Sequence, residues 1–217
     1  MGELPGFFIV FEGGDGTGKT TQAGLLVEKL NEYGIDPVLT RQPGGTPVGA
    51  TIRQILLDPA SGDIDPRAET LLYLADKAQH VQEVILPALA AGKVVVCDRF
   101  VDSVLAYQGA GRQQEISEIE PLVRWATFDL RPDLTVLLDV DPERAMGNIV
   151  EKDRLEQAGY ELHARTRQYF LEIAARDPRN YLVVEALTSK ASNAAMIFDR
   201  VRRLGIPGLP TDRNGDD

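Results

Sequence analysis

Residues 7–22 read FFIVFEGGDGTGKTTQ, and this stretch decides the fold. It opens with an apolar run that predicts a short buried strand, and a helix is expected to begin at Lys19. The turn between them matches the phosphate-binding pattern G-x-x-x-x-G-K-[ST] through Gly13, Gly18, Lys19 and Thr20. The sequence therefore predicts a phosphate-binding loop between the first strand and the first helix.

The residue types of this loop suit phosphate chemistry. Glycine adopts positive φ, so successive N–H groups form a concave anion site at the helix start. We expect Lys19 to reach the β- and γ-phosphates of a nucleotide and the Thr20 hydroxyl to bind Mg²⁺. The residues expected to bind the nucleotide are Gly13, Gly14, Asp15, Gly16, Thr17, Gly18, Lys19 and Thr20. The alternative is a structural turn with a chance lysine, but average composition yields such a match in only about one protein in a hundred.

Length and composition indicate one α/β domain. The 217 residues are 43% hydrophobic and 26% charged, which is ordinary for a globular protein. We expect a single phosphate-loop domain over residues 1–206 and a loose tail over residues 207–217, which are rich in Pro, Gly and Asp.

Charge and cysteine content restrict partners and compartment. The formal net charge of −10 disfavours a nucleic acid polymer, although a small phosphorylated ligand needs only a local basic pocket. No apolar run is long enough for a membrane span, and no basic segment indicates a secretory signal. Cys97 is the single cysteine, so we expect a buried, unreactive thiol and a cytoplasmic location.

Apolar strand-like runs alternate with helical patterns along the chain. Strands are expected over residues 7–11, 37–40, 93–97, 134–140 and 181–184. Helices are expected over residues 20–33, 48–57, 66–91, 101–107, 117–128, 142–150, 160–175 and 189–204, with a break at 109–112. This alternation predicts a phosphate-loop α/β/α fold in three layers, with a five-stranded parallel sheet. Ligands then bind beyond the carboxyl ends of the strands.

Charged residues follow several of these strands. Asp98 ends an apolar strand, where a carboxylate holds Mg²⁺ or, alternatively, caps the next helix. Arg41 and Arg99 also follow strands, so together they suit a second anion site, although each alone could form a surface ion pair. The charged connector at residues 151–157, within a lid expected at about residues 147–157, fits a lid that carries a cation, and it equally fits a solvated loop.

Two tyrosines and two histidines receive weaker interpretations. Tyr73 and Tyr107 lie on predicted helices near these loops, where they could stack on a base or sugar, but core packing is the commoner role. His80 and His163 have no second metal-ligating residue nearby, so neither is assigned to a metal or to catalysis.

Several motifs together resemble the thymidylate kinase family. They are FEGGDGTGKTTQ, RQPGGT, LLYLADKAQHV, DRFVDSVLAYQGAGR, RPDLTVLLDVDPE and DRLE, in the family's order from about Phe7 to Phe198. The resemblance implies transfer of the γ-phosphoryl group of ATP to dTMP with Mg²⁺, and a homodimer.

The resemblance also implies residue roles. In the acceptor site, Asp15 would bind the sugar 3′-hydroxyl, Arg41 and Arg99 the dTMP phosphate, and Tyr73 the thymine ring. The residues that would complete the nucleoside pocket are Lys77, Ser103, Tyr107 and Gln108. Thr20 and Asp98 would organise Mg²⁺, and the catalytic set would be Asp15, Lys19, Arg99 and Arg154.

Three departures from the family pattern stand out. Gln42 replaces the acid of R-E-P-G-G-T, which removes a negative charge expected near Mg²⁺. Lys77 replaces the arginine that reads a thymine carbonyl, and a lysine cannot bind in a fork. The lid is poor in basic residues, so Arg154 is the expected lid cation. Another nucleoside monophosphate kinase, or a nucleotide-binding switch with little turnover, remains an alternative.

Overall fold

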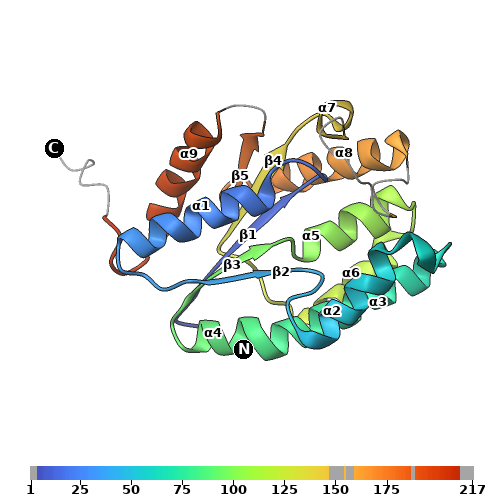
Figure 1. The fold of residues 1–217 in the computed structure, drawn as a ribbon, viewed down its shortest axis with the longest axis horizontal. Helices are drawn as coiled ribbons and strands as arrows, with labels where there is room; N and C mark the ends of the chain where they lie inside the picture. Colours follow the sequence, from blue (N-terminus) through green and yellow to red (C-terminus); the bar gives the residue numbers. More distant parts are fainter. Residues whose placement is uncertain (1–3, 147–153, 155–158, 187–188, 211–217) are drawn as a thin grey trace.

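The fold is a parallel sheet between two layers of helices (Figure 1). A computed structural model describes residues 4–146, 154, 159–186 and 189–210. The strands are β1 (Phe7–Gly13), β2 (Val38–Arg41), β3 (Val94–Asp98), β4 (Leu134–Asp139) and β5 (Tyr181–Glu185). They pair in parallel in the order β2-β3-β1-β4-β5, which confirms the predicted five-stranded sheet.

The helices of the described residues cover both faces of the sheet (Figure 1). Their bounds are α1 (Lys19–Glu32), α2 (Pro47–Leu57), α3 (Pro66–His80), α4 (Leu86–Ala90), α5 (Val101–Val104), α6 (Ile116–Thr127), α7 (Pro142–Met146), α8 (Tyr160–Arg176) and α9 (Lys190–Arg202). A 3₁₀ turn spans Pro59–Ser61, and π-helical segments span Val81–Ile85 and Leu105–Gly111. None of the described helices has the length and apolar character needed to cross a membrane.

Side-chain alternation along β1 divides the core in two. Phe8 and Val10 join the cluster that packs against α2 through α6, whereas Ile9 and Phe11 join the cluster formed with α1 and α9. Both faces of this strand are therefore buried, as expected for the central strand of a parallel sheet.

The predicted helix over residues 66–91 is a continuous helical path with one change of register. Asp65 caps its start by accepting a hydrogen bond from the Arg67 N–H at 2.9 Å. The path widens into the π-helical segment Val81–Ile85 just before Pro87, which has no N–H for an α-helical bond to the carbonyl four residues earlier.

The predicted break at residues 109–112 is wrong. The helical path continues from α5 through the π-helical segment to Gly111. Its glycines provide close packing: a Cβ at Gly109 would lie 2.9 Å from the Ile116 side chain, and one at Gly111 would lie 2.8 Å from Thr166 Oγ1. Packing against α6 and α8 therefore outweighs the weak helix propensity of glycine.

Two expectations concern segments at the edge of the described chain. The lid at residues 147–157 lies outside the described residues except for Arg154. The tail was expected to be loose from residue 207, but Leu209 is buried in the cluster beneath α1 and α9. Residues 211–217 lie outside the described part of the chain.

Candidate active site

Strand register brings the site residues to one edge of the sheet. Asp98 pairs with Phe11 of β1 and with Arg41 of β2, so the segments that follow these strands begin at the same level. The phosphate loop, the Asp98–Phe100 turn and the loop after Arg41 therefore meet at the carboxyl edge, as predicted.

The phosphate loop adopts the glycine-dependent geometry expected from its sequence. Gly13 has a φ of 134°, and a Cβ there would lie 2.3 Å from the Leu138 carbonyl oxygen. Gly18 has a φ of 89° and precedes α1 without a side-chain cap, so the first N–H groups of the helix remain available. The Lys19 ammonium donates to the Gly14 carbonyl oxygen at 2.5 Å. Burial, together with the positive charge of Arg99, lowers the pKa of Lys19 to about 8.

Thr20 and Asp98 form a pair of hard oxygen ligands. The Thr20 hydroxyl donates to Asp98 Oδ2 at 2.5 Å, at the junction of β3 and α1. A hydroxyl and a carboxylate at this separation fit Mg²⁺, which takes few protein ligands when phosphate oxygens and water complete its octahedron. Among the residues that the structure describes, no group of three or more His, Cys, Asp or Glu side chains could hold a metal by itself.

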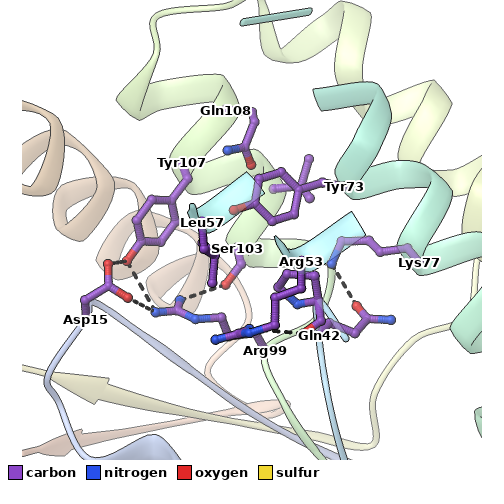
Figure 2. A pocket seen from close by; sticks show the side chains of 12 residues that line it. Asp15, Gln42, Arg53, Leu57, Tyr73, Lys77, Arg99, Ser103, Tyr107 and Gln108 are labelled. Carbon is purple, nitrogen blue, oxygen red and sulfur yellow. Dashed lines mark hydrogen bonds and ion pairs between the residues drawn. The ribbon is translucent and has the colours of Figure 1, made fainter. Parts of the chain in front are cut away.

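A pocket lies beside Arg99, which lines it (Figure 2). The space, including its open mouth, is about 500 Å³, a size suited to a small ligand. Its lining residues are Asp15, Gln42, Pro43, Arg53, Leu57, Tyr73, Lys77, Arg99, Ser103, Val104, Tyr107 and Gln108. We call this space the acceptor pocket, and it contains every predicted acceptor residue except Arg41.

Arg99 is the centre of a hydrogen-bond network at one end of the acceptor pocket. It donates to Asp15 Oδ1 at 2.5 Å, to the Gly13 carbonyl oxygen at 2.9 Å and to Ser103 Oγ at 3.1 Å. The Tyr107 hydroxyl donates to the other oxygen of Asp15 at 2.7 Å. Figure 2 shows these side chains facing one another. The network joins the phosphate loop to the acceptor pocket.

Burial and charge oppose each other at Asp15. Burial alone would raise the pKa of its carboxyl, but the charges of Arg99 and Lys19 and the Tyr107 hydrogen bond lower the pKa overall. Asp15 is therefore an ionised acceptor of hydrogen bonds and not a proton donor at neutral pH.

The sequence analysis missed Glu12, which fixes the turn that carries Arg99. Arg99 has a φ of 70°, an uncommon conformation for a residue with a Cβ. The fully buried Glu12 carboxylate accepts hydrogen bonds from the Phe100 N–H at 2.8 Å and from Ser103 Oγ at 2.6 Å. The available signal was an acid at the end of an otherwise apolar strand, where a buried carboxylate needs hydrogen-bond donors.

Lys77 lies at the opposite end of the acceptor pocket (Figure 2). Its ammonium donates to Gln42 Oε1 at 2.8 Å and to the Phe100 carbonyl oxygen at 2.7 Å, and burial lowers its pKa. The side chain of Gln42 is buried and is hydrogen-bonded to Lys77 and His80. Gln42 also lines the acceptor pocket, and the expectation that position 42 affects charge near Mg²⁺ stays a prediction.

The two arginines predicted to form one clamp line different hollows. Arg41 is exposed beside Thr20 and Asp98, in a hollow on the metal side of the loop. Arg53 of α2 lines the acceptor pocket with Arg99 and donates to the Pro43 carbonyl oxygen at 3.0 Å. Sequence reasoning missed Arg53 because a helical arginine usually indicates a solvated surface. The signal was its spacing of four from Gly49 and three from Leu56, which are both buried.

Arg154 does not contact the phosphate loop. Its guanidinium forms an ion pair with Glu69 and donates to the Leu56 carbonyl oxygen at 2.8 Å. Glu69 is fully buried and also accepts hydrogen bonds from Arg112 at 3.2 Å and from Gln108 at 3.1 Å. Burial would raise the pKa of Glu69, but these donors lower it overall. The described contacts thus link Arg154 to Gln108 of the acceptor pocket.

Comparisons with known proteins show which family this chain resembles. The family model described as thymidylate kinase matches residues 11–197. A thymidylate kinase of Cutibacterium acnes is 56% identical over 201 residues, which cover 93% of this chain and 98% of that protein. One of a Synechococcus species is 49% identical over 205 residues, which cover 94% and 96%. A crystal structure of thymidylate kinase from Ehrlichia chaffeensis superposes with a TM-score of 0.76 at 34% identity, covering 90% of this chain and 98% of that one.

Proposed function

Because the chain belongs to the thymidylate kinase family, we propose that it transfers the γ-phosphoryl group of ATP to dTMP. The products are ADP and dTDP: the bond from the γ-phosphorus to its bridging oxygen breaks, and a phosphate oxygen of dTMP takes its place. The observation that carries the proposal is the contact between Asp15 and Arg99. This contact joins the phosphate loop to a pocket that is lined by two arginines, Arg53 and Arg99. Such a transfer needs two anion sites in line.

On the acceptor side, we assign the phosphate of dTMP to Arg99 and Arg53. Guanidinium groups match phosphate oxygens in pairs. Asp15 would accept a hydrogen bond from the sugar 3′-hydroxyl, and the Tyr107 ring beside it would contact the deoxyribose. The base would lie between Tyr73 and other polar side chains that line the pocket, which include Lys77, Ser103 and Gln108.

On the donor side, the loop N–H groups and Lys19 would bind the ATP phosphates. Thr20 and Asp98 would hold Mg²⁺, which supplies positive charge to the phosphoryl oxygens when bound. Arg41 belongs to this side by its position beside both residues. Since phosphoryl transfer requires positioning and charge neutralisation, no strong general base is needed. Arg154 remains the proposed lid cation, and this role requires it to leave Glu69.

An ADP-release assay across dTMP, dUMP, UMP, CMP and AMP tests the function. We expect release that depends on dTMP and is much slower with the ribonucleotides. A preference for another monophosphate would support a different nucleoside monophosphate kinase. Tight ATP binding without acceptor-dependent release would support the nucleotide-binding switch.

We further propose a homodimer formed by α3 and α6. These helices pack on each other and expose large apolar side chains, namely Leu71, Leu122, Trp125 and, just past α6, Phe128. Trp125 is 81% exposed, an unfavourable position for an indole unless a partner covers it. A cytoplasmic location stays a prediction from the sequence.

A further inference from the structure

A chain of hydrogen bonds, buried except at its Thr40 end, runs from Lys77 to Thr40 behind the acceptor pocket. Lys77 Nζ lies 2.8 Å from Gln42 Oε1, Gln42 Nε2 lies 2.8 Å from His80 Nδ1, and His80 Nε2 lies 2.6 Å from Thr40 Oγ1. Gln42 and His80 are 2% and 0% exposed, so solvent cannot replace the contacts that Gln42 makes with Lys77 and His80. Figure 2 shows the Lys77–Gln42 contact at the edge of the pocket.

The chemistry of Lys77 determines which group donates and which accepts in each of these hydrogen bonds. An ammonium group only donates, so the Gln42 atom that faces it must be the amide oxygen. The Gln42 NH₂ group then donates to His80 Nδ1, which leaves the ring proton on Nε2. Nε2–H donates to the Thr40 hydroxyl. Burial and the nearby Lys77 charge lower the pKa of His80 to about 4, so the ring is neutral and has a single tautomer at neutral pH.

The loop that carries Gln42 is fixed on the helix that carries Lys77. Asp76 of α3 accepts a hydrogen bond from the Gly44 N–H at 2.9 Å. Gly45 packs directly on His80, since a Cβ there would lie 2.4 Å from Nε2. The amide of Gln42 is therefore held by its neighbours on both sides and cannot turn over without losing two hydrogen bonds.

We propose that Gln42 and His80 are positioning residues that orient the Lys77 ammonium toward the base of the acceptor nucleotide. Two of the three ammonium N–H groups are committed to Gln42 and to the Phe100 carbonyl, which among the described residues leaves one for a ligand. A lysine held in this way donates a single directed hydrogen bond to a pyrimidine carbonyl. The inference rests on the proposed function, because it assumes that this pocket takes the acceptor.

Two substitutions of His80 separate positioning from packing. In His80→Asn the side-chain oxygen can replace Nδ1 and still accept from Gln42. In His80→Gln the side-chain amide can replace Nε2 and still donate to Thr40, but Gln42 loses its acceptor. We expect His80→Gln to raise the KM for dTMP about fivefold, with kcat and the KM for ATP within about twofold of the unmodified enzyme. His80→Asn should stay within about twofold in all three constants.

Two substitutions of Gln42 test the same proposal in case His80→Gln fails to fold. Gln42→Met removes the acceptor for Lys77 at similar length, whereas Gln42→Glu keeps an oxygen against the ammonium. We expect the KM for dTMP to rise about fivefold in Gln42→Met and to rise less in Gln42→Glu. Equal effects within each pair, or no effect in either, would show that these residues only fill space.

A third measurement does not depend on turnover. The chain contains two histidines, so nitrogen NMR of the full-length protein, with His80→Asn to assign the signals, identifies the ring tautomer of His80. We expect the Nε2–H tautomer near pH 7. A protonated Nδ1 would overturn the proposed direction of the chain whatever the activity. Absence of dTMP-dependent ADP release by the unmodified protein would instead overturn the proposed function.

Discussion

Arg99 donates a hydrogen bond to Asp15 at 2.5 Å, although 84 positions separate the two residues in the sequence. Asp15 belongs to the phosphate loop and Arg99 to the turn after β3, so their contact joins the proposed donor and acceptor sites. Asp15→Asn should lower kcat/KM for dTMP about 10- to 100-fold, because a neutral amide holds the guanidinium less firmly. Steady-state kinetics measures this. Asp36→Asn, which breaks an exposed ion pair with Lys93, is the control and should have no effect.

Arg53 lines the acceptor pocket and Arg41 lines the hollow beside Thr20 and Asp98, so we expect their substitutions to have different effects. Arg53→Ala should raise the KM for dTMP about 10- to 100-fold with little change in the KM for ATP, since it removes a charge from the acceptor pocket. Arg41→Ala should act mainly on ATP, since Arg41 lies beside Thr20 and Asp98. Initial rates with each substrate varied in turn decide between them. The reverse pattern would restore Arg41 to the acceptor site.

The lowered pKa of Lys19 predicts an unusual alkaline limit. The ammonium must be charged to bind phosphate, and in the free enzyme it loses its proton near pH 8. We therefore expect kcat/KM for ATP to fall as the pH rises through about 8 and to level off only well below this pH, so the fall comes before an ordinary lysine would titrate. In Lys19→Arg the guanidinium stays charged, so any remaining activity should not fall with pH in this range. A fall of kcat/KM that begins only near pH 10 in the unmodified enzyme would contradict the prediction.

The raised pKa of Asp102 predicts that the free energy of unfolding decreases as the pH rises. Burial, and then the charge of Glu12, raises its pKa to about 7 in the folded protein, against about 3.9 in an unfolded chain. The folded state thus binds more protons between these values, so the free energy of unfolding should decrease as the pH rises from about 4 to about 7.

Asp102→Asn isolates this effect. The amide oxygen still accepts the Tyr181 hydroxyl hydrogen bond, which is 2.7 Å long in the native protein. The variant should be more stable than the native protein near pH 8 and show a flatter dependence on pH. Urea unfolding at several pH values measures both. An unchanged slope would mean that Asp102 is ionised throughout this range.

The exposed apolar surface of α6 predicts the oligomeric state. Trp125→Lys should convert a dimer to a monomer, because the charge cannot be buried against a second copy. Light scattering with size-exclusion chromatography gives the mass directly. Leu39→Lys, another exposed apolar position on β2, should leave a dimer intact. A native protein of monomer mass would refute the dimer.

Local patterns were sufficient to predict most of the fold. The apolar runs became the five strands, and local caps begin two of the predicted helices, at Asp65 and at Asp141, whose carboxylate accepts from the Glu143 N–H at 3.0 Å. The glycines at 109 and 111 misled the prediction because their role depends on Ile116 and Thr166, which no local pattern brings to them. The order of the strands likewise depends on packing between distant segments.

The site was predictable where chemistry follows a strand directly. Asp15, Asp98 and Arg99 lie at or just beyond strand ends, and Thr20 lies at the start of the helix that follows the loop. The structure pairs Thr20 with Asp98 and Asp15 with Arg99. Arg53 and Glu12 were missed because their roles arise from a helix face and a buried strand position. The partners of Gln42 could not be foreseen either, since they come from residues 35 and 38 positions further along.

Consecutive residues Tyr107 and Gln108 both line the acceptor pocket, within the π-helical segment Leu105–Gly111. In a regular α-helix, neighbouring side chains diverge by about 100°, and a widened turn of this kind accommodates one additional residue. Deleting a single position between 109 and 111 would therefore tighten the turn and reorient one of the two side chains, without altering any group that meets the nucleotide. If the pocket takes the acceptor as proposed, substrate selectivity should depend on the number of residues in the turn as well as on their identity.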